Sequence, residues 1–342
     1  MDRLLLNDVG DGLNLIIEKS ERKLFVDFGG KKIDRSKITC IKDTFLLSHF
    51  HLDHYNGFFK KICKSNYPHP YFFHQHRIID FYYPKMPSFE GSQEFLYSLF
   101  SINILSLLME EPIELMIFKK VLRNNLYKIK FKPVSKGDYI FLGGSKFEIL
   151  WPPESFKDND NIKKVISVAI ENFNEAKKES ELLRKIYDLI YEESKNIDNL
   201  NIELIESIIS KIDNDNIRER IENSEKIKNV NESLRRAANR LSISFRQEDN
   251  ILFLGDLESD EIKIVIDDLI EKKNIFYDVI IAAHHGTHWN ESLRNIKSNI
   301  CLVSVGDTLR KNLRYEYKSI SKKLIRTDEW GNIILKKEIS VN

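Results

Sequence analysis

The sequence predicts an α/β fold that is interrupted by a helical insertion, and three observations support this prediction. Short apolar runs rich in Ile, Val, Leu and Phe, which are typical of buried strands, alternate with longer segments of helical spacing. Two of these runs end directly in clusters of histidine, as expected where strands deliver polar loops to the edge of a sheet. Between Pro153 and Arg240, glycine and proline are absent and Ile or Leu recurs every three or four residues, which predicts helices.

The segment before the insertion is predicted to consist mainly of strands. A β-hairpin opens it, with strands over Leu13–Glu18 and Leu24–Phe28 and a polar turn at Ser20–Lys23. The apolar run Thr44–Ser48 is too short for a helix and predicts a buried strand. Further elements are expected as a helix over Ser92–Phe118 and as strands over Tyr71–His74, Tyr127–Lys132, Tyr139–Phe141 and Lys146–Trp151.

The segment after the insertion returns to alternating strands and helices. The expected elements are a helix over Asp260–Lys272 and strands over Leu241–Phe245, Ile251–Leu254, Tyr277–Ala283, Ile300–Val303 and Asn332–Lys336. We therefore predict one domain formed by residues 1–155 and 238–342, with residues 156–237 inserted into it as about three helices. The sequence contains no Gly/Ser-rich linker that would tether the insertion as a separate domain.

The composition excludes several classes of protein. The 342 residues include 53 basic and 52 acidic side chains, and this balance provides no overall field to hold a polyanion. No apolar run approaches the roughly 20 residues of a membrane-spanning helix, and Asp2 and Arg3 lie too close to the first leucines for an export signal. The three cysteines, Cys40, Cys63 and Cys301, follow no disulfide or zinc-ribbon spacing. We expect a cytoplasmic protein that does not bind membranes.

Three histidines and an aspartate follow the strand predicted at Thr44–Ser48. In an extended segment His49 and His51 point to the same side, and a turn after them directs Asp53 and His54 to a second point nearby. Imidazole nitrogen and carboxylate oxygen are ligands of zinc and similar divalent cations, so the cluster predicts two neighbouring metal sites. A solvated loop with chance histidines and a single structural zinc, which is usually closed and cysteine-rich, are less favoured interpretations.

Two further strand ends carry residues of the same kind. His284, His285 and His288 follow the strand at Tyr277–Ala283, and Asp256 follows the strand at Ile251–Leu254 after a glycine. A carboxylate at that position can bridge two cations and offset their repulsion, although an aspartate after glycine is by itself more often a turn residue. Because the candidate ligands exceed what one tetrahedral site can use, we expect two divalent metal ions, zinc or manganese.

The motif H-x-H-x-D-H after a strand, with the preceding hairpin that ends in Val26-Asp27-Phe28-Gly29-Gly30, resembles the metallo-β-lactamase-fold superfamily. Further matches follow the order seen in the hydrolase domain of bacterial DNA-uptake competence channels. They are Ile149-Leu150-Trp151-Pro152-Pro153, Asn239 with Leu241-Ser242, Leu252-Phe253-Leu254-Gly255-Asp256-Leu257, Ala283-His284-His285-Gly286-Thr287, Val303-Ser304-Val305-Gly306 and Arg326-Thr327-Asp328 with Gly331. The resemblance covers roughly residues 1–155 and 238–337. It implies a four-layer αββα sandwich with metals at the sheet edges and hydrolysis of nucleic-acid phosphodiesters.

The resemblance also implies ligands for each of two metals. One metal would be held by His49 and His51, the other by Asp53, His54 and His285, with Asp256 bridging both. The chain departs from the superfamily in two ways. Only His69, His74 and His76 are available as the further histidine ligand that many members carry, and the competence domains often have an aspartate in place of His51. The second difference favours zinc or manganese through more nitrogen ligation.

Catalytic roles are likewise implied by the resemblance. Asp53 would orient or deprotonate a metal-bound hydroxide that attacks the phosphorus. His284 would face the substrate and either donate a hydrogen bond to a phosphoryl oxygen or protonate the leaving group, and His288 would assist in binding the substrate. Asp27 is expected to accept a hydrogen bond from the metal loop or, with equal weight, to cap the end of its strand.

The substrate class is open between alternatives. Nucleic acid is favoured by the resemblance and by paired histidines suited to an anionic oxygen, whereas a small phosphodiester, a lactone or a thioester suits the same metals. Basic clusters that are able to contact phosphates, or equally well to form solvated faces, lie at Lys60-Lys61-Lys64, Arg235-Arg236-Arg240 and Arg310-Lys311-Arg314 with Tyr315 and Tyr317. A non-catalytic relative that binds a protein partner through the insertion is the remaining alternative.

The insertion leaves and rejoins the chain near the predicted metal loops. We therefore expect it to lie beside the active-site mouth, where it would control access of substrate or partner.

Overall fold

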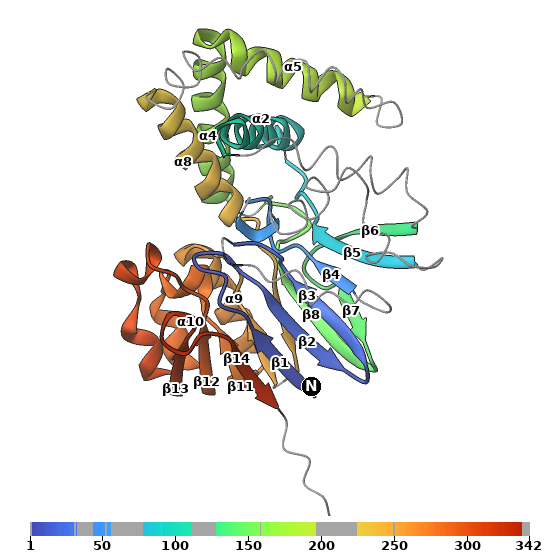
Figure 1. Cartoon of the computed structure of the whole chain (residues 1–342), viewed down its shortest axis with the longest axis vertical. Helices are drawn as coiled ribbons and strands as arrows, with labels where there is room; N and C mark the ends of the chain where they lie inside the picture. Colours follow the sequence, from blue (N-terminus) through green and yellow to red (C-terminus); the bar gives the residue numbers. More distant parts are fainter. Residues whose placement is uncertain are drawn as a thin grey trace, which may run out of the picture. The chain divides into compact units, whose positions relative to one another are not determined.

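The structure is a computed structural model and describes residues 2–30, 32, 44–51, 53–55, 78–89, 91–110, 128–157, 159–195, 224–248 and 250–336 (Figure 1). The chain divides into two compact units. The sheet unit comprises Met1–Met86, Tyr127–Glu154 and Asn239–Asn342, and the helical unit comprises Pro87–Leu126 and Ser155–Ala238. The helical unit thus includes a segment that precedes the predicted insertion. The insertion borders at residues 156 and 237 stay a prediction.

The first sheet of the sheet unit has, within the described residues, the strand order β14-β1-β2-β3-β4-β5-β6. Its strands are β1 (Arg3–Leu6), β2 (Leu15–Lys19), β3 (Arg22–Val26), β4 (Thr44–Leu46), β5 (Ile78–Pro84), β6 (Lys128–Val134) and β14 (Ile333–Lys336). Pairing is antiparallel from β14 to β3 and parallel from β3 to β6. The predicted hairpin is confirmed as β2 and β3. Its turn residues Ser20 and Glu21 have positive φ angles of 47° and 63°, as tight hairpin turns require.

The second sheet has, in the described part of the chain, the strand order β13-β12-β11-β10-β9-β8-β7. Its strands are β7 (Tyr139–Leu142), β8 (Ser145–Trp151), β9 (Ser244–Gln247), β10 (Ile251–Phe253), β11 (Phe276–Ile281), β12 (Lys297–Val303) and β13 (Ser321–Arg326). Pairing is antiparallel from β7 to β10 and parallel from β10 to β13. Parallel strands end at the same edge, so the loops after β10, β11 and β12 emerge side by side.

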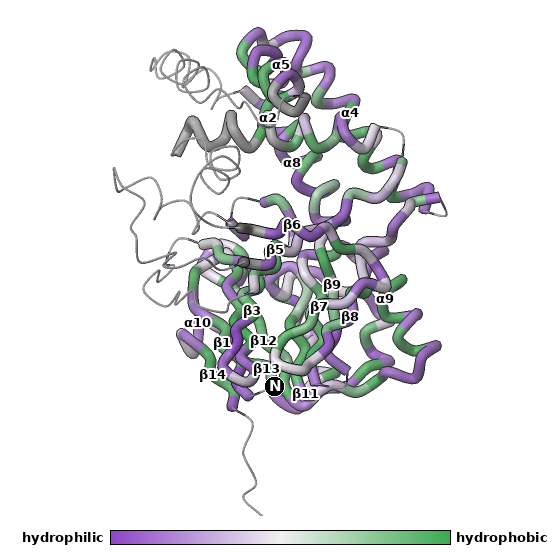
Figure 2. Tube along the Cα trace, turned by 90° about the vertical axis from the view of Figure 1, so that its right-hand side faces the viewer, coloured by the Kyte–Doolittle hydropathy of each residue, from purple (hydrophilic) through white to green (hydrophobic). Residues whose placement is uncertain are grey.

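Hydrophobic side chains of both sheets form one buried core. Leu15 and Val26 of the first sheet belong to the same cluster as Phe147, Phe245 and Phe253 of the second. The rings of Phe245 and Phe253 stack with their centroids 4.9 Å apart. Hydrophobic residues recur along the strands of both sheets (Figure 2). Strands β2 and β10 bury three consecutive residues each, Leu15–Ile17 and Ile251–Phe253. The two sheets therefore pack face to face as a sandwich.

Helices flank the sheets of this unit. Helix α9 (Ser259–Glu271) follows β10 and buries Ile262, Val265, Ile266 and Leu269, which lie on one helical face. The short helix α10 (Thr327–Trp330) follows β13. Two mixed sheets with a shared core and flanking helices confirm the predicted α/β sandwich and match the arrangement expected of a metallo-β-lactamase fold.

The helical unit is built from helices, most of them amphipathic. Its described helices are α2 (Ser92–Glu110), α4 (Asp160–Glu179), α5 (Glu181–Lys195) and α8 (Glu225–Asn239). Helix α2 packs against α4 and α5, and Asn174 of α4 donates a hydrogen bond to Glu94 of α2 at 2.8 Å. Three helices of the predicted insertion, α4, α5 and α8, lie in the described residues. None of the described helices combines the length and the apolar character that crossing a bilayer requires.

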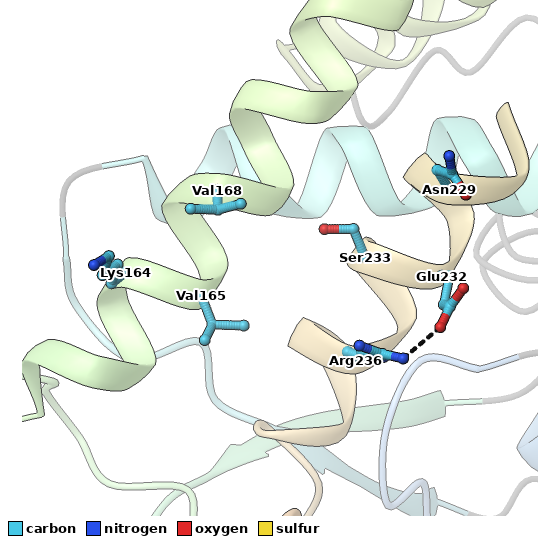
Figure 3. Close-up of a pocket in the computed structure, with 7 residues that line it drawn as sticks. All are labelled: Lys164, Val165, Val168, Asn229, Glu232, Ser233 and Arg236. Atoms are coloured by element: carbon cyan, nitrogen blue, oxygen red, sulfur yellow. Dashed lines mark hydrogen bonds and ion pairs between the residues drawn. The ribbon is translucent and has the colours of Figure 1, made fainter. Parts of the chain in front are cut away.

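A groove runs between α4 and α8 within the helical unit (Figure 3). Val165 and Val168 lie on the α4 side, and Ser233 and Arg236 lie on the α8 side. Arg236 is paired with Glu232 of the same helix, one turn away. The groove is a feature of the predicted insertion, and the protein partner expected for the insertion stays a prediction.

Most predicted strands are confirmed with borders shifted by a few residues, but three strands were not predicted. These are β1, which precedes the opening hairpin, together with β5 and β13. The helix predicted over Ser92–Phe118 is confirmed as α2 up to Glu110, and its last part lies outside the described residues. The strand predicted at Tyr71–His74 also lies outside them, as do His69, His76 and the lysine cluster at 60–64.

Candidate metal centre

A buried carboxylate holds the loop after β4 in place. Asp27 follows β3 directly, is buried and has a positive φ angle of 57°. Its Oδ1 accepts a hydrogen bond from the backbone N–H of Ser48 at 2.6 Å. Its Oδ2 accepts hydrogen bonds from Oγ of Ser48 at 2.6 Å and from Nδ1 of His54 at 2.7 Å. The predicted role of Asp27 as an acceptor that braces the metal loop is confirmed.

Glycines allow the same loop to lie close to neighbouring backbone. A Cβ atom on Gly29 would lie 1.9 Å from the carbonyl oxygen of Asp53, and one on Gly12 would lie 2.7 Å from the same atom. The backbone N–H of Phe28 donates to the carbonyl oxygen of His54 at 2.8 Å. A side chain at position 12 or 29 would therefore displace Asp53 and His54.

The second histidine loop follows β11 as a strained turn. His284, His285 and Gly286 have positive φ angles of 45°, 56° and 78°, a conformation that costs energy for the two histidines. The backbone N–H of His284 donates to the carbonyl oxygen of Gly255 at 2.9 Å. The backbone N–H of Asp256 donates to Oγ of Ser242 at 2.9 Å. Hydrogen bonds thus fix the histidine turn against the loop that carries Asp256.

Four imidazole rings converge on one oxygen of Asp256. Oδ2 lies 3.3 Å from Nε2 of His54, 3.6 Å from Nε2 of His285, and 3.7 Å from Nε2 of both His49 and His284. All of these side chains are buried except that of His284, which is 24% exposed. The two predicted histidine clusters and the predicted aspartate therefore meet at one point, and His284 lies on its solvent-exposed side.

Burial and charge oppose each other at this point. Burial tends to raise the pKa of the Asp256 carboxyl, but the surrounding imidazoles, His54 foremost, hold that pKa well below its usual range. Burial tends to lower the pKa of His54, but Asp256 and Asp27 raise it well above its usual value. The ring of His54 thus lies between two carboxylates that both favour a positive charge on it.

Two other imidazoles are held neutral. Burial, assisted by the neighbouring rings of His54 and His51, lowers the pKa of His49 well below its usual value. Burial also lowers the pKa of His284 to about 3, against the opposing effect of Asp256. Neutral imidazole is the form that ligates metal ions.

The atoms around Asp256 fit a metal cation. Nδ1 of His285 lies 3.0 Å from the carbonyl oxygen of Ser304, which only accepts hydrogen bonds, so Nδ1 carries the hydrogen and Nε2 offers a lone pair. Nε2 of His54 is buried and has no hydrogen-bond partner among the residues that the structure describes. Without metal, a proton on His54 lies beside the Asp256 carboxylate, and a metal cation can take the place of that proton between the nitrogens of His54 and His285.

Two overlapping groups of described residues have ligand atoms close enough together to hold an ion. They are His49, His54 and Asp256, and Asp53, His54 and His285. The second group consists of the residues predicted to hold one of the metals. On the other side His51 contacts His49, with Nδ1 of His51 2.8 Å from Nε2 of His49. The shared metal of His49 and His51, the bridging role of Asp256, the number of metals and the choice of zinc or manganese stay predictions.

His288 lies against His284 rather than alone in a loop. Its Nε2 lies 2.7 Å from Nδ1 of His284, and its Nδ1 donates to the carbonyl oxygen of Leu257 at 2.9 Å. The hydroxyl of Tyr317 donates to the carbonyl oxygen of His288 at 2.7 Å and accepts from the backbone of Ala283 at 3.1 Å. A phosphate contact and a solvated face were the two alternatives left open for Tyr317, and both are wrong because its side chain is buried and bridges the histidine loop. The substrate-binding role of His288 stays a prediction.

Sequence reasoning missed the groups that orient the rings. They include Oγ of Ser48, which lies 3.0 Å from Nδ1 of His49, and the carbonyl oxygens of Ser304 and Leu257. Ser48 stands directly before the first histidine, and this position was an available signal. Backbone carbonyls have no signature in a sequence, because every residue has one.

No family model matches the sequence, and no curated protein matches it. The chain resembles several solved structures, among them the following two. A diphosphatase from the PhnP family has 11% identity and a TM-score of 0.43, over 95% of this chain and 84% of that one. The metallo-β-lactamase fold protein YhfI from Bacillus subtilis has 11% identity and a TM-score of 0.43, over 98% of this chain and 100% of that one. The closeness to competence-channel hydrolases stays a prediction.

Proposed function

We propose that this protein is a metal-dependent hydrolase that cleaves phosphodiester bonds, with nucleic acid as its substrate. The observation that carries the proposal is the convergence of His49, His54, His284 and His285 on Asp256, with Nε2 atoms 3.3 to 3.7 Å from one carboxylate oxygen. Nitrogen and oxygen ligands in this arrangement, partly open to solvent, are typical of catalytic rather than structural metal sites.

Divalent ions would be held by the two groups of ligands that share His54. When bound, such ions activate water and offset negative charge on a phosphate. Asp256 is buried and ionised, so its charge offsets the repulsion between two cations. Asp27 holds the His54 ring through Nδ1 and leaves Nε2 for the metal.

Asp53 is the carboxylate of the centre that reaches solvent. It is half-buried and lies within ligand distance of His54 and His285. Its carboxylate would orient the attacking water and accept the proton that the water loses. Asp256 is enclosed by four imidazoles, so its role would be to offset the charge of the cations rather than to contact the attacking water.

Cationic side chains beside the second histidine loop support a phosphate-containing substrate. The backbone N–H of Arg314 donates to the carbonyl oxygen of Gly286 at 2.9 Å, so its segment adjoins the loop. Arg310, Lys311 and Arg314 are exposed, and the ring of Tyr315 is 54% exposed. Exposed cations with a nearby aromatic ring bind the phosphates and bases of single-stranded nucleic acid.

The arginine cluster at the end of α8 gives less support. Arg240 forms an ion pair with the buried Glu261 at 2.6 Å, and Arg236 is paired with Glu232. These side chains are engaged within the protein. In the segment Arg310–Arg314, Arg310 is likewise paired with Asp307 at 3.3 Å. Support for a nucleic-acid substrate over a neutral ester therefore rests on the exposed Lys311 and Arg314.

A substrate panel tests the proposal. The purified protein, loaded with manganese or zinc, is assayed against labelled single- and double-stranded DNA, RNA, a small chromogenic phosphodiester, a lactone and a thioester. We expect cleavage of the chromogenic ester and of single-stranded nucleic acid, lost with a chelator and restored by metal. Hydrolysis of the lactone or thioester alone would contradict the phosphodiester assignment. Elemental analysis without transition metal, together with no hydrolysis, would instead indicate a non-catalytic protein that binds a partner.

A further inference from the structure

The surroundings of His284 determine which of its nitrogen atoms carries hydrogen. Nδ1 of His284 lies 2.7 Å from Nε2 of His288 and 3.1 Å from Oγ1 of Thr287. Nδ1 of His288 donates to the carbonyl oxygen of Leu257 at 2.9 Å, so Nε2 of its neutral ring accepts. Oγ1 of Thr287 donates its one hydrogen to the carbonyl oxygen of His284 at 2.7 Å, so toward Nδ1 it also accepts.

Two acceptors therefore lie next to Nδ1 of His284, and Nδ1 must be the donor. The other nitrogen, Nε2, then offers a lone pair in the neutral ring. It lies 3.7 Å from Oδ2 of Asp256, beyond the range of a hydrogen bond. His285 adopts the same tautomer and places its Nε2 3.6 Å from the same oxygen. Two consecutive histidines thus offer lone pairs beside one carboxylate oxygen.

The backbone explains how consecutive side chains reach one point. In a strand, neighbouring side chains point to opposite faces. Here His284 and His285 have φ angles of 45° and 56°, and this left-handed turn brings both rings to Asp256. Glycine would adopt the same conformation without strain, so a histidine at position 284 indicates a function of its side chain.

We propose that His284 is a metal ligand through Nε2, and that His288 and Thr287 are positioning residues that hold it in this tautomer. The inference rests on the metal site of the proposed function. It differs from the proton-donor role expected from the sequence, because a nitrogen with a lone pair accepts a proton and has none to give. It adds a nitrogen ligand to those expected from the motifs.

Metal content and affinity test this assignment without reference to catalysis. The full-length protein and its variants are loaded with Zn²⁺ or Co²⁺ and examined by elemental analysis, by competition with a chelator and by the visible absorption of the Co²⁺ form. We expect His284→Ala to weaken binding of at least one ion by more than about tenfold and to change the Co²⁺ absorption. His288→Ala should weaken binding about tenfold, as loss of a residue that orients a ligand does.

Matched variants separate orientation from general damage. Thr287→Ser keeps the hydroxyl acceptor and should bind metal as the wild type does, whereas Thr287→Val removes the acceptor and should weaken binding. Glu258→Gln is the control for charge. Oε2 of Glu258 lies 3.7 Å from Nδ1 of His288, beyond hydrogen-bond range, so this substitution should leave metal affinity unchanged. Circular dichroism and thermal unfolding report folding. If His284→Ala does not fold, the pair Thr287→Ser and Thr287→Val decides.

Two outcomes separate this inference from the proposed function. A folded His284→Ala protein with unchanged metal content, affinity and Co²⁺ absorption would overturn the ligand assignment. Lost hydrolysis of esters with poor leaving groups in that same variant would point back to a proton donor. A wild type whose metal binding depends on His284, but which hydrolyses no phosphodiester, would contradict the proposed function and support the ligand assignment.

Discussion

The two histidine loops reach the same carboxylate, but different kinds of group hold them there. Asp27 holds His54 of the first loop at 2.7 Å, whereas the carbonyl oxygens of Ser304 and Leu257 hold His285 and His288 of the second at 3.0 and 2.9 Å. Although burial opposes the shift, Asp256 and Asp27 raise the pKa of His54. A charged acceptor thus orients a ring and also makes it basic, while a neutral carbonyl orients a ring without that effect.

Exposure follows the same division. His49, His51 and His54 of the first loop are buried, whereas the side chains of His284 and His288 are 24% and 21% exposed. The second loop also adjoins the exposed cations of Arg310–Arg314 through Gly286. On the proposed function, the imidazoles of the first loop would hold metal only, whereas His284 and His288 of the second loop would also meet the substrate.

The largest effect is expected at the carboxylate that both loops share. Asp256→Asn should lower kcat/KM for a small chromogenic phosphodiester by about 10²- to 10³-fold, because a neutral amide cannot offset the charge of two cations. Steady-state kinetics of the metal-loaded protein measures the loss, and circular dichroism confirms the fold. If kcat/KM falls little while the variant still binds both metals, Asp256 serves only as a turn residue.

The charged brace of the first loop should matter more than the neutral brace of the second. Asp27→Asn is expected to weaken metal binding by about 10- to 100-fold, since His54 loses its anionic partner. Competition with a chelator measures the metal affinity of this variant and of His288→Ala, for which a loss of only about tenfold is expected. Equal losses would show that the charge of Asp27 contributes nothing beyond its hydrogen bonds.

The same brace predicts a pH dependence of metal binding. Because the pKa of His54 is raised well above its usual value, a proton competes with metal at Nε2, and affinity falls as the pH falls below that pKa. Asp27→Asn lowers the pKa of His54, so its affinity curve should shift to lower pH by about one unit. Chelator competition between pH 6 and 9 measures both curves. Coincident curves would mean that Asp27 does not set the basicity of His54.

The smallest effect is expected at the rim of the second loop. Arg314→Ala should raise KM for a single-stranded oligonucleotide a few-fold and reduce the salt dependence of binding by about one ion. KM for the small ester should be unchanged. Lys263→Ala removes an exposed cation of α9 and is the matched control. An equal effect of Lys263→Ala would indicate that overall charge, rather than the second loop, attracts the polymer.

Spacing in the sequence predicted which side chains meet at the centre. His49, His54, Asp256 and His285 each follow an apolar strand, and strand ends at one edge bring such residues together. The left-handed conformation of His284 was not predictable, because residues other than glycine adopt it rarely. The tautomers followed only from the structure, since those of His285 and His288 depend on carbonyl oxygens distant in sequence, and that of His284 depends in turn on His288.

The sequence explains why two of the three missed strands, β13 and β1, were not predicted. Strand β13 reads Ser-Lys-Lys-Leu-Ile-Arg and has no buried position, which is typical of a charged edge strand and gives no apolar alternation. Strand β1 consists largely of leucine, which does not distinguish strand from helix. The packing of α2 with α4 and α5 depends on contacts between distant segments, which local spacing does not report.

The left-handed residues of the centre have a consequence for the evolution of this protein. Asp27, His284 and His285 hold φ angles of 57°, 45° and 56°, each at a cost on the order of 1 kcal/mol compared with glycine. Selection for thermal resistance alone would replace them, and His284→Gly should therefore unfold at a higher temperature than the wild type when neither carries metal. On the proposed function, these residues trade thermal stability for metal binding. Substitutions selected only for thermal stability would be expected first at these residues of the candidate metal centre.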